Sequence, residues 1–374
     1  MDQEMTLSSY HQAAEALDAQ ILPLLQRRLD LAGAFARQTP PGRMPVQDRG
    51  WERRLLSGVD TDVNSGMFLR LMYRDMMETA SAYQRVMADA GEDTLPHECH
   101  EVFPRAATVA CQGVEGAYSQ AAADRVFPFA DITYTNTFEG VFEAVESGRC
   151  RFGVLPVENS AHGSVVQNFD LMRRHRFSIA RAMKLHVNHC LLGLPGATLE
   201  GIRTVVSHEQ AVGQCSAFLK ERGVETRLCR NTAMAAMQVA QGGDPSVAAI
   251  AQESCAALYG LKVLKQRLQN TDNNYTRFIV IEKDPVVFPG GSKISILFST
   301  ANESGALERV MARFSCLGLN LTKLESRPEE GSDFHYVFYA DFQASVEDAD
   351  VRRLLCSLQR DLPLFTFLGA YQEV

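Results

Sequence analysis

The pattern of apolar residues divides the chain into three segments with different periodicities. Between residues 8 and 91, apolar side chains recur three or four positions apart or at multiples of these spacings, as in Leu17, Ile21, Leu24, Leu31 and Phe35. This spacing predicts helices, the second near 51–59 and the third over 68–88, with a Pro- and Gly-containing loop at 39–45. We therefore expect an all-α N-terminal domain over residues 1–92.

Short apolar runs alternate with helical patterns in the middle segment, residues 106–284. The apolar runs predict strands at 108–111, 131–136, 151–157, 203–207, 225–229 and 246–250. Helical stretches that each end at Gly are predicted at 138–148, 209–223 and 232–243. Strands that alternate with helices are typical of an α/β domain, and we expect its sheet to be largely parallel.

The C-terminal segment, residues 292–374, has a third pattern, and a Pro- and Gly-containing linker at 284–291 precedes it. Its predicted elements are a strand, a helix, two strands, a helix and a strand, at 292–300, 305–318, 319–327, 334–342, 346–361 and 365–372. This βαββαβ order is that of a ferredoxin-like domain.

Composition excludes several classes of function. The chain has 374 residues and a net charge of −8, which gives no electrostatic basis for binding nucleic acid or an acidic membrane surface. Neither a signal peptide nor a membrane-spanning run is visible. The nine cysteines are scattered without a CxxC pair, which is typical of reduced thiols. We expect a cytoplasmic protein.

Polar side chains follow several predicted strands of the middle segment. Open α/β sheets bind ligands at the carboxyl ends of their strands, and helix N-termini there attract anions. Any one of these residues could be a simple helix cap, but together they predict a site at one edge of the sheet. They are Ser119, Glu158, Asn159, Ser160, Ser207 and Thr232.

The stretch NNYTRFIVI, residues 273–281, adds a hydroxyl and a fixed cation. Thr276 and Arg277 stand immediately before the predicted buried strand 278–281. One interpretation is a polar loop that closes into a sheet. The other is a site for an anion whose hydroxyl must be protonated to leave. The residues lack a nucleotide-binding fingerprint and spaced metal ligands, since the His- and Glu-rich run 97–101 has no second cluster. We expect no metal and no cofactor.

Five motifs in this segment resemble those of the prephenate dehydratase family. They are GVEGAYS (113–119), PVENSAHGSV (156–165), SHEQAVGQC (207–215), NTAMAA (231–236) and NYTRF (274–278). Downstream, ESGAL (303–307) and NLTKLESRP (320–328) resemble the regulatory ACT domain of that family. The resemblance implies an α/β dehydratase domain of two subdomains, similar to periplasmic binding proteins, followed by a ferredoxin-like ACT domain.

The resemblance also implies an activity. Prephenate dehydratases are carbon–oxygen lyases that convert prephenate to phenylpyruvate, water and carbon dioxide in L-phenylalanine biosynthesis. The implied catalytic residues are Thr276, Asn159, Ser207 and Gln214, and the implied substrate-binding residues are Ser119, Glu158, Ser160, Thr232, Arg277 and Phe278. Our hypothesis is that Thr276 donates a proton to the leaving hydroxyl and that Arg277 binds a carboxylate.

The resemblance to ACT domains implies feedback by L-phenylalanine. Such ligands bind between two ACT domains, so we expect at least a homodimer. The implied effector residues are Gly305, Ala306, Leu307, Asn320, Leu321, Glu325, Ser326 and Arg327. The alternative is a purely structural dimerisation module.

The N-terminal helices resemble chorismate mutase in the stretches 17–32 and 45–52, which gives a bifunctional architecture. The matching site residues are Arg28, Asp48 and Glu52, whereas His11, Thr39 and Trp51 stand where that family has cations. Two hypotheses follow: a divergent mutase that takes chorismate, or a helical domain that only dimerises or stabilises the chain. For the whole protein, the alternatives are arogenate dehydratase and a non-catalytic amino-acid sensor.

Overall fold

The computed structural model describes residues 6–38, 49–58, 65–88, 93–329 and 335–374. It divides into two compact units, Met1–Thr94 and Leu95–Val374. Each unit is described by itself below.

The N-terminal unit contains the predicted helices, α1 (Leu7–Gln38), α2 (Arg49–Gly58) and α3 (Gly66–Ala88). α1 packs against α3 through small and flexible side chains, among them Ala32, Ala36, Met77 and Ala80, which are buried. Pro23 lies within α1 without ending it. Much of the apolar stripe that predicts α1 is exposed in a single chain, since Leu17, Leu24 and Leu31 are 59%, 62% and 72% exposed.

The second unit begins with a six-stranded sheet in the order β2-β1-β3-β11-β5, with β4 paired to β3. β1 is parallel to β2 and β3, whereas β11 is antiparallel to both β3 and β5. Helices α4, α5 and α6 pack on it. We call these elements the first lobe: β1 (Ala106–Gln112), α4 (Tyr118–Val126), β2 (Phe129–Thr135), α5 (Phe138–Glu146), β3 (Phe152–Asn159), β4 (Gly163–Ser164), α6 (Val166–Arg174), β5 (Ser178–His186) and β11 (Tyr275–Glu282).

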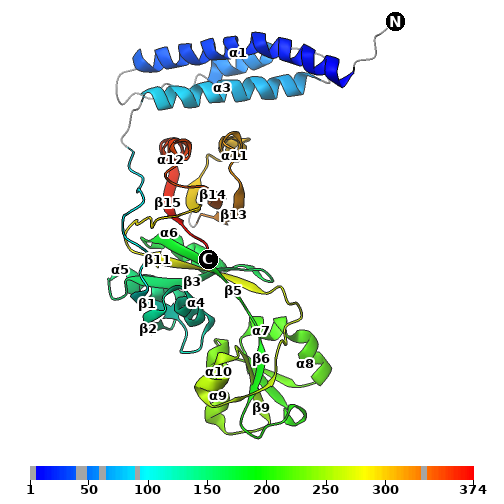
Figure 1. Cartoon of the computed structure of the whole chain (residues 1–374). Coiled ribbons are helices and arrows are strands. Elements are labelled where there is room, and N and C mark those ends of the chain that lie inside the picture. Colours follow the sequence, from blue (N-terminus) through cyan, green and yellow to red (C-terminus); the bar gives the residue numbers. More distant parts are fainter. Residues whose placement is uncertain (1–5, 39–48, 59–64, 89–92, 330–334) are drawn as a thin grey trace. The chain divides into compact units, whose positions relative to one another are not determined.

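A separate five-stranded sheet follows, in the order β10-β6-β9-β7-β8. We call its elements the second lobe (Figure 1): β6 (Cys190–Gly193), η1 (Leu199–Gly201), β7 (Thr204–Ser207), α7 (Glu209–Gln214), α8 (Ser216–Arg222), β8 (Glu225–Leu228), α9 (Thr232–Gly242), β9 (Val247–Ala251), α10 (Ser254–Tyr259) and β10 (Lys262–Lys265).

The expectation of a largely parallel sheet is wrong. The middle segment, residues 106–284, forms two sheets, and each mixes parallel and antiparallel pairs. The reason is that the chain passes between the lobes twice, through 187–189 and through 266–274, so that β11 returns antiparallel into the middle of the first sheet. The predicted helix over 209–223 is also divided, because α7 ends and α8 begins around the buried Cys215.

The C-terminal segment has the predicted βαββαβ order, and its four strands form a sheet in the order β13-β14-β12-β15. α11 and α12 cover one face of this sheet, and the other face packs on the first lobe (Figure 1). We call residues 293–374 the C-terminal module: β12 (Lys293–Ser299), α11 (Ala306–Cys316), β13 (Leu321–Pro328), β14 (Tyr336–Gln343), α12 (Ala349–Asp361) and β15 (Leu364–Tyr371).

Apolar side chains and backbone pairing both hold the C-terminal module on the first lobe. Leu297, Tyr339 and Leu368 share a buried cluster with Ile279 of β11. Beyond β15, residues 372–374 run beside β5, where Ala182 N–H donates to Gln372 O and Val374 N–H donates to Ala182 O, both at 2.9 Å. The first lobe and the C-terminal module are therefore packed together as one body.

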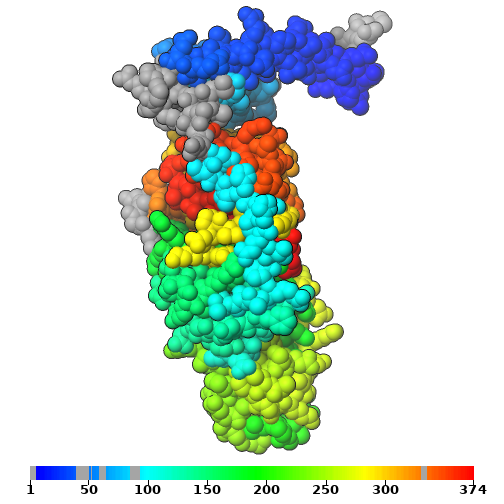
Figure 2. Space-filling view, turned by 60° about the vertical axis from the view of Figure 1, so that its left-hand side comes forward, coloured from blue at the N-terminus to red at the C-terminus, as the bar shows by residue number. Residues whose placement is uncertain are grey.

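The two predicted linkers of this unit lie side by side on its surface. The cyan segment around residues 95–103 runs along the yellow segment around 284–291 (Figure 2), and Cys99 N–H donates to Val287 O at 2.8 Å. The His- and Glu-rich run lies here, with Glu98 N–H bound to the Glu347 carboxylate at 2.9 Å. Within the described part of the chain, no helix has the length and apolar character to cross a membrane.

Candidate active site

The candidate site is built around Thr276, the second residue of β11. Its partner in the ladder is Asn159, the last residue of β3. Asn159 Nδ2 lies 3.0 Å from Thr276 Oγ1, and both residues are half-buried. Two residues that are 117 positions apart in the sequence thus meet at the ends of two paired strands.

The orientation of the Asn159 amide is fixed by the turn that follows β3. Its Oδ1 accepts hydrogen bonds from the backbone N–H groups of Ala161 and His162, both at 3.0 Å. Since backbone N–H groups can only donate, the other amide atom, Nδ2, must face Thr276 as a donor. Thr276 Oγ1 therefore accepts, and its own O–H is available to donate to another group.

The same reasoning extends through the segment that crosses back from the second lobe. Asn159 Nδ2 also donates to Asn274 Oδ1 at 2.9 Å, so Asn274 Nδ2 is the donor to Gln214 Oε1 at 3.0 Å. Gln214 Oε1 also accepts from His189 Nε2 at 2.7 Å, and Gln214 Nε2 donates to His162 Nδ1 at 3.1 Å. One set of donors and acceptors thus runs from Thr276 to the end of α7.

His189 is buried at the other crossing of the chain. Burial lowers the pKa of His189, and the hydrogen bond to Gln214 opposes this only in part. The ring is therefore neutral near pH 7 and carries its proton on Nε2, toward Gln214. Asn274 is 1% exposed and His189 is 2% exposed, so both are held in place by their surroundings.

Asn274 and His189 are site residues that the sequence analysis does not select. Both lie in the crossing segments, where no periodic pattern exists to mark them. Asn274 stands within the NYTRF motif, which is a local signal for its importance. For His189 the sequence gives no comparable signal, because its contact with Gln214 depends on how the lobes are joined.

The other predicted polar residues lie at or just after strand ends or in the first turn of a helix, and their hydrogen bonds differ. Ser207 is fully buried at the end of β7, and its Oγ donates to Ile250 O at 2.7 Å. Ser160 Oγ donates to Asn273 O at 2.8 Å and accepts from Tyr275 N–H at 2.9 Å. Ser119 and Thr232 lie in the first turns of α4 and α9, where they are 6% and 9% exposed.

The loop that precedes α4 touches the second lobe. Gln252 Nε2 donates to Gly116 O at 2.5 Å, and Tyr259 O–H donates to Glu115 O at the same distance. Together with the hydrogen bond between Gln214 and His162, these contacts join the two lobes outside the crossing segments. Ser119 is thereby brought to the junction of the lobes.

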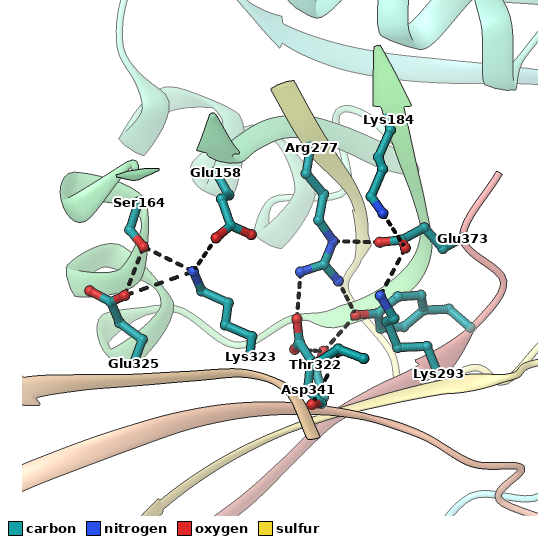
Figure 3. Close-up of polar contacts among 12 residues, drawn as sticks. Glu158, Ser164, Lys184, Arg277, Lys293, Thr322, Lys323, Glu325, Asp341 and Glu373 are labelled. Carbon is teal, nitrogen blue, oxygen red and sulfur yellow. Dashed lines mark hydrogen bonds and ion pairs between the residues drawn. The ribbon is translucent and has the colours of Figure 1, made fainter. Parts of the chain in front are cut away.

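Arg277 differs from expectation. Successive side chains of a strand point to opposite faces, so Arg277 points away from the Thr276 hydroxyl and into the contact with the C-terminal module. Figure 3 shows its guanidinium between Asp341 and Glu373: Nη1 pairs with Asp341, and Nε lies 2.7 Å from Glu373 Oε1. Nη2 donates to Tyr371 Oη at 2.8 Å. These groups occupy the guanidinium, so we withdraw Arg277 as the ligand of a substrate carboxylate.

The charges around Arg277 stabilise one another. Burial lowers the pKa of Arg277, but nearby Tyr371, Asp341 and Glu373 outweigh this effect and raise it above the ordinary value for Arg. Burial raises the pKa of Glu373, but Lys293, Arg277 and Lys184 outweigh it and lower the pKa below the ordinary value for Glu. Arg277 therefore keeps its charge, and Glu373 remains a carboxylate to a lower pH than an ordinary Glu does.

Two more predicted substrate-binding residues also lie elsewhere. Glu158 is on the same face as Arg277, and its carboxylate accepts from Lys323 Nζ at 3.0 Å (Figure 3). Phe278 is 2% exposed and belongs to the apolar core of the first lobe. The alternation along the strands explains the position of Glu158, since Asn159 and Thr276 have the other parity. Phe278 shares the parity of Thr276 but lies farther along β11, where that face is covered by the apolar core.

The predicted effector residues fall at two ends of the C-terminal module. Gly305, with φ of 79°, precedes α11, and Ala306 and Leu307 begin it. Asn320 and Leu321 lie at the opposite end, where β13 starts. On β13, Glu325 accepts from Ser164 Oγ at 2.7 Å and Arg327 lies 3.3 Å from Asp170, whereas Ser326 is exposed.

The mutase-like residues are only partly described. Arg28 is half-buried in α1, with its guanidinium carbon 5.8 Å from the centre of the Trp51 ring. Asp48 and the side chain of Glu52 lie outside the described residues. Trp51 thus stacks on the guanidinium at the position where the mutase family has a cation.

Comparisons of the sequence with known proteins identify its relatives. The model of the prephenate dehydratase family matches residues 109–286. Arogenate dehydratase/prephenate dehydratase 1 of Arabidopsis thaliana is 38% identical over 279 residues, which are 70% of this chain and 71% of that protein. The bifunctional chorismate mutase/prephenate dehydratase of Escherichia coli is 30% identical over 381 residues, which are 99% of this chain and 97% of that protein.

Solved structures show the same likeness. The prephenate dehydratase of Arthrobacter aurescens in complex with L-Phe is 27% identical with a TM-score of 0.65, over 71% of this chain and 89% of that one. A structure described as GqqA, a quorum quenching acylase, is 30% identical with a TM-score of 0.66, over 71% of this chain and 98% of that one.

Proposed function

The chain belongs to the prephenate dehydratase family, and we propose that the junction of its two lobes converts prephenate to phenylpyruvate, water and carbon dioxide in L-phenylalanine biosynthesis. The observation that carries this proposal is the hydrogen bond from Asn159 Nδ2 to Thr276 Oγ1. It leaves the Thr276 O–H as a donor at the start of β11, next to the crossing segment.

Dehydration of prephenate needs such a donor. The bond between the ring carbon and its hydroxyl breaks, and the oxygen leaves as water only when it receives a proton. The bond to the ring carboxylate breaks at the same stage, carbon dioxide departs, and its electron pair completes the aromatic ring. Thr276 supplies the proton, directly or through water, and recovers it from solvent. No electron acceptor is required, because the electron pair stays in the product.

The substrate carboxylates need partners other than Arg277. Ser119 and Thr232 support this role, since they stand in the first turns of α4 and α9. Helix N-termini offer N–H groups and a positive dipole to an anion. Ser207 and Ser160 already donate to backbone oxygens, so we assign them to holding the second lobe and the crossing segment in place.

We propose that the C-terminal module is an ACT domain that binds L-phenylalanine as an effector. The relative of known structure that is complexed with L-Phe supports this. α11 has 11 residues, or about 16 Å at 1.5 Å per residue, and separates Gly305 from Asn320. One copy of the module therefore presents the two halves of the predicted site at opposite ends, which favours a site completed by a second copy.

The exposed apolar positions of the N-terminal unit favour the same homodimer. Leu17, Leu24 and Leu31 are each more than half exposed, and such apolar surfaces usually mark an interface. The stacking of Trp51 on Arg28 favours a helical unit that associates over one that works as a mutase. Its mutase activity is decided by assay.

The test is a set of three assays on the purified full chain, given prephenate, chorismate or arogenate alone. Phenylpyruvate from prephenate, lost in Thr276→Ala, supports the proposal. Phenylpyruvate from chorismate as well means that the helical unit is a working mutase. Phenylalanine from arogenate at a higher kcat/KM means an arogenate dehydratase. Product from none of the three refutes the catalytic proposal and favours a sensor.

A further inference from the structure

Thr276 and Arg277 are consecutive residues whose side chains serve different parts of the molecule. The Thr276 hydroxyl meets Asn159 at the proposed active site, while the Arg277 guanidinium meets Asp341 and Glu373 of the C-terminal module. We propose that Arg277 is a positioning residue for Thr276, a role that rests on the proposed function. Its ion pairs fix the β11 backbone so that Thr276 stays within reach of Asn159, and they couple the C-terminal module to the dehydration step.

The guanidinium is held firmly enough for this task. The side chains of Arg277, Asp341 and Glu373 are 8%, 11% and 17% exposed, so their charges are screened little by water. Nη1 and Nη2 donate hydrogen bonds to Asp341 of β14 and Tyr371 of β15, and Nε forms an ion pair with Glu373 in the segment after β15. A planar fork held on several sides has little freedom to shift.

Thr276 needs such an anchor because its strand pairing is irregular. The register between β11 and β3 shifts between Arg277 and Phe278, so Arg277 faces Glu158 while Phe278 faces Pro156. Pro156 has no N–H to donate to the ladder, and its carbonyl accepts from Asn168 Nδ2 at 2.6 Å. Thr276 lies beyond this bulge and is paired with Asn159 of β3 and Leu185 of β5, so its distance from Asn159 depends on the geometry of the bulge next to it.

The partners of Arg277 connect it to most of the C-terminal sheet. Ser295 Oγ of β12 contacts both Asp341 of β14 and Tyr371 of β15. Glu373 is also paired with Lys293 of β12 at 2.8 Å and with Lys184 of β5 at 3.2 Å. A displacement of β12, β14 or β15 therefore moves a group that touches the guanidinium.

The packing beside this network is not complete. A cavity between the first lobe and the C-terminal module is lined by Arg277, Ser295, Asp341 and Tyr371 on its polar side, and by apolar residues such as Ile279 and Leu368 on the other. β12 leads into α11, whose start carries Gly305 of the proposed effector site. A change at that site thus has a continuous route of contacts to β11.

The experiment compares Glu373→Gln and Asp341→Asn with Asp170→Asn in the full chain. Asp170 forms another ion pair between the first lobe and the C-terminal module, with Arg327, but on α6 rather than at β11. We expect Glu373→Gln and Asp341→Asn to lower kcat for prephenate about tenfold, with KM changed less than about twofold, because a small misplacement of the donor slows only the chemical step. Asp170→Asn leaves kcat within about twofold of wild type.

A second measurement separates positioning from simple destabilisation. In the Thr276→Ala background there is no hydroxyl to position, so adding Glu373→Gln changes kcat by less than about twofold. Arg277→Lys, which retains a charge, is expected to keep more activity than Arg277→Gln. Melting temperatures identify any variant that does not fold, and Asp341→Asn replaces Glu373→Gln in that event.

The outcomes are distinct. Wild-type protein that releases no phenylpyruvate refutes the proposed function, and the positioning role with it. Active wild type with unchanged kcat in Glu373→Gln and Asp341→Asn overturns only the positioning role. Equal losses in Asp170→Asn, or fully additive losses with Thr276→Ala, mean that Arg277 is merely structural and also overturn it.

Discussion

Asn159 lies directly opposite Thr276 in the pair of strands β3 and β11, and its Nδ2 donates to Thr276 Oγ1 at 3.0 Å. Two backbone N–H groups hold the Asn159 oxygen on the other side, so this bond has one possible direction. The direction matters because it leaves the proton of Thr276 free for the substrate.

The first prediction reverses that direction. Asn159→Asp places a carboxylate opposite Thr276, which then donates its proton inward instead of to the leaving hydroxyl. We expect kcat for prephenate to fall about 100-fold, the usual cost of removing one donor from a transition state. Steady-state kinetics measure this, and Thr276→Ser, which retains a hydroxyl, is the control. An Asn159→Asp enzyme with wild-type kcat would show that Thr276 does not act as the donor.

The second prediction concerns stability and pH. Burial lowers the pKa of His189 in the folded protein below its value of 6.5 in the unfolded chain. The neutral ring therefore contributes full stability above that value, and the contribution is lost as pH falls, because the unfolded chain then binds a proton that the folded one does not.

We expect the melting temperature of His189→Gln to depend less steeply on pH than that of wild type between pH 7.5 and pH 5.5, the working range set by that pKa. Differential scanning calorimetry provides the measurement. His335→Gln, at an exposed position, is the control and should follow wild type. Parallel curves for His189→Gln and wild type would contradict the assignment of a buried neutral ring.

The third prediction compares two ion pairs of different burial. Arg277→Met leaves Asp341 without its cation in a buried place, and we expect a loss of about 3–5 kcal/mol in the free energy of unfolding. Arg353→Met breaks a pair with Asp350 whose side chains are 76% and 63% exposed, and we expect a loss within about 0.5 kcal/mol. Denaturant titrations measure the free energy of unfolding of both variants. Similar losses would mean that water reaches the Arg277 network in solution.

The fourth prediction concerns the close approach of β15 to β5. Gly369 has φ of 149°, and a Cβ there would lie 2.3 Å from Ile179 O. Gly369→Ala must push the strands apart, so we expect a loss of more than about 3 kcal/mol in the free energy of unfolding. Gly148 has φ of 73° and open space around it. For Gly148→Ala we therefore expect only the cost of a left-handed backbone conformation, about 1–2 kcal/mol in the free energy of unfolding. Equal losses would refute the steric argument.

The sequence predicts element types well where the pattern is local. The helices of the N-terminal unit and the βαββαβ order follow from periodicity alone, because each element of that module is amphipathic. Periodicity does not predict the strands β5, β6 and β10, so the expectation of two subdomains rests on the family resemblance alone. Which sheet a strand joins depends on contacts between distant residues that no local pattern contains.

The site is predicted in part for a similar reason. Thr276, Asn159 and Gln214 are brought into one chain of hydrogen bonds, whereas Arg277 and Glu158 face the C-terminal module. The two-residue alternation of a strand was already a reason to separate Thr276 from Arg277. The role of His189 was not predictable, because it depends on the hydrogen bond to Gln214, which forms only when the two lobes are joined.

The double crossing between the lobes has a consequence for biosynthesis. The second lobe is an uninterrupted stretch, 190–265, and can close its own sheet as soon as it leaves the ribosome. The first lobe must wait, because β11 fills the place between β3 and β5 and is synthesised only afterwards. While the second lobe is synthesised, β3 and β5 each have an edge without its β11 partner. Exposed strand edges promote aggregation, so a chaperone would be most useful during this interval.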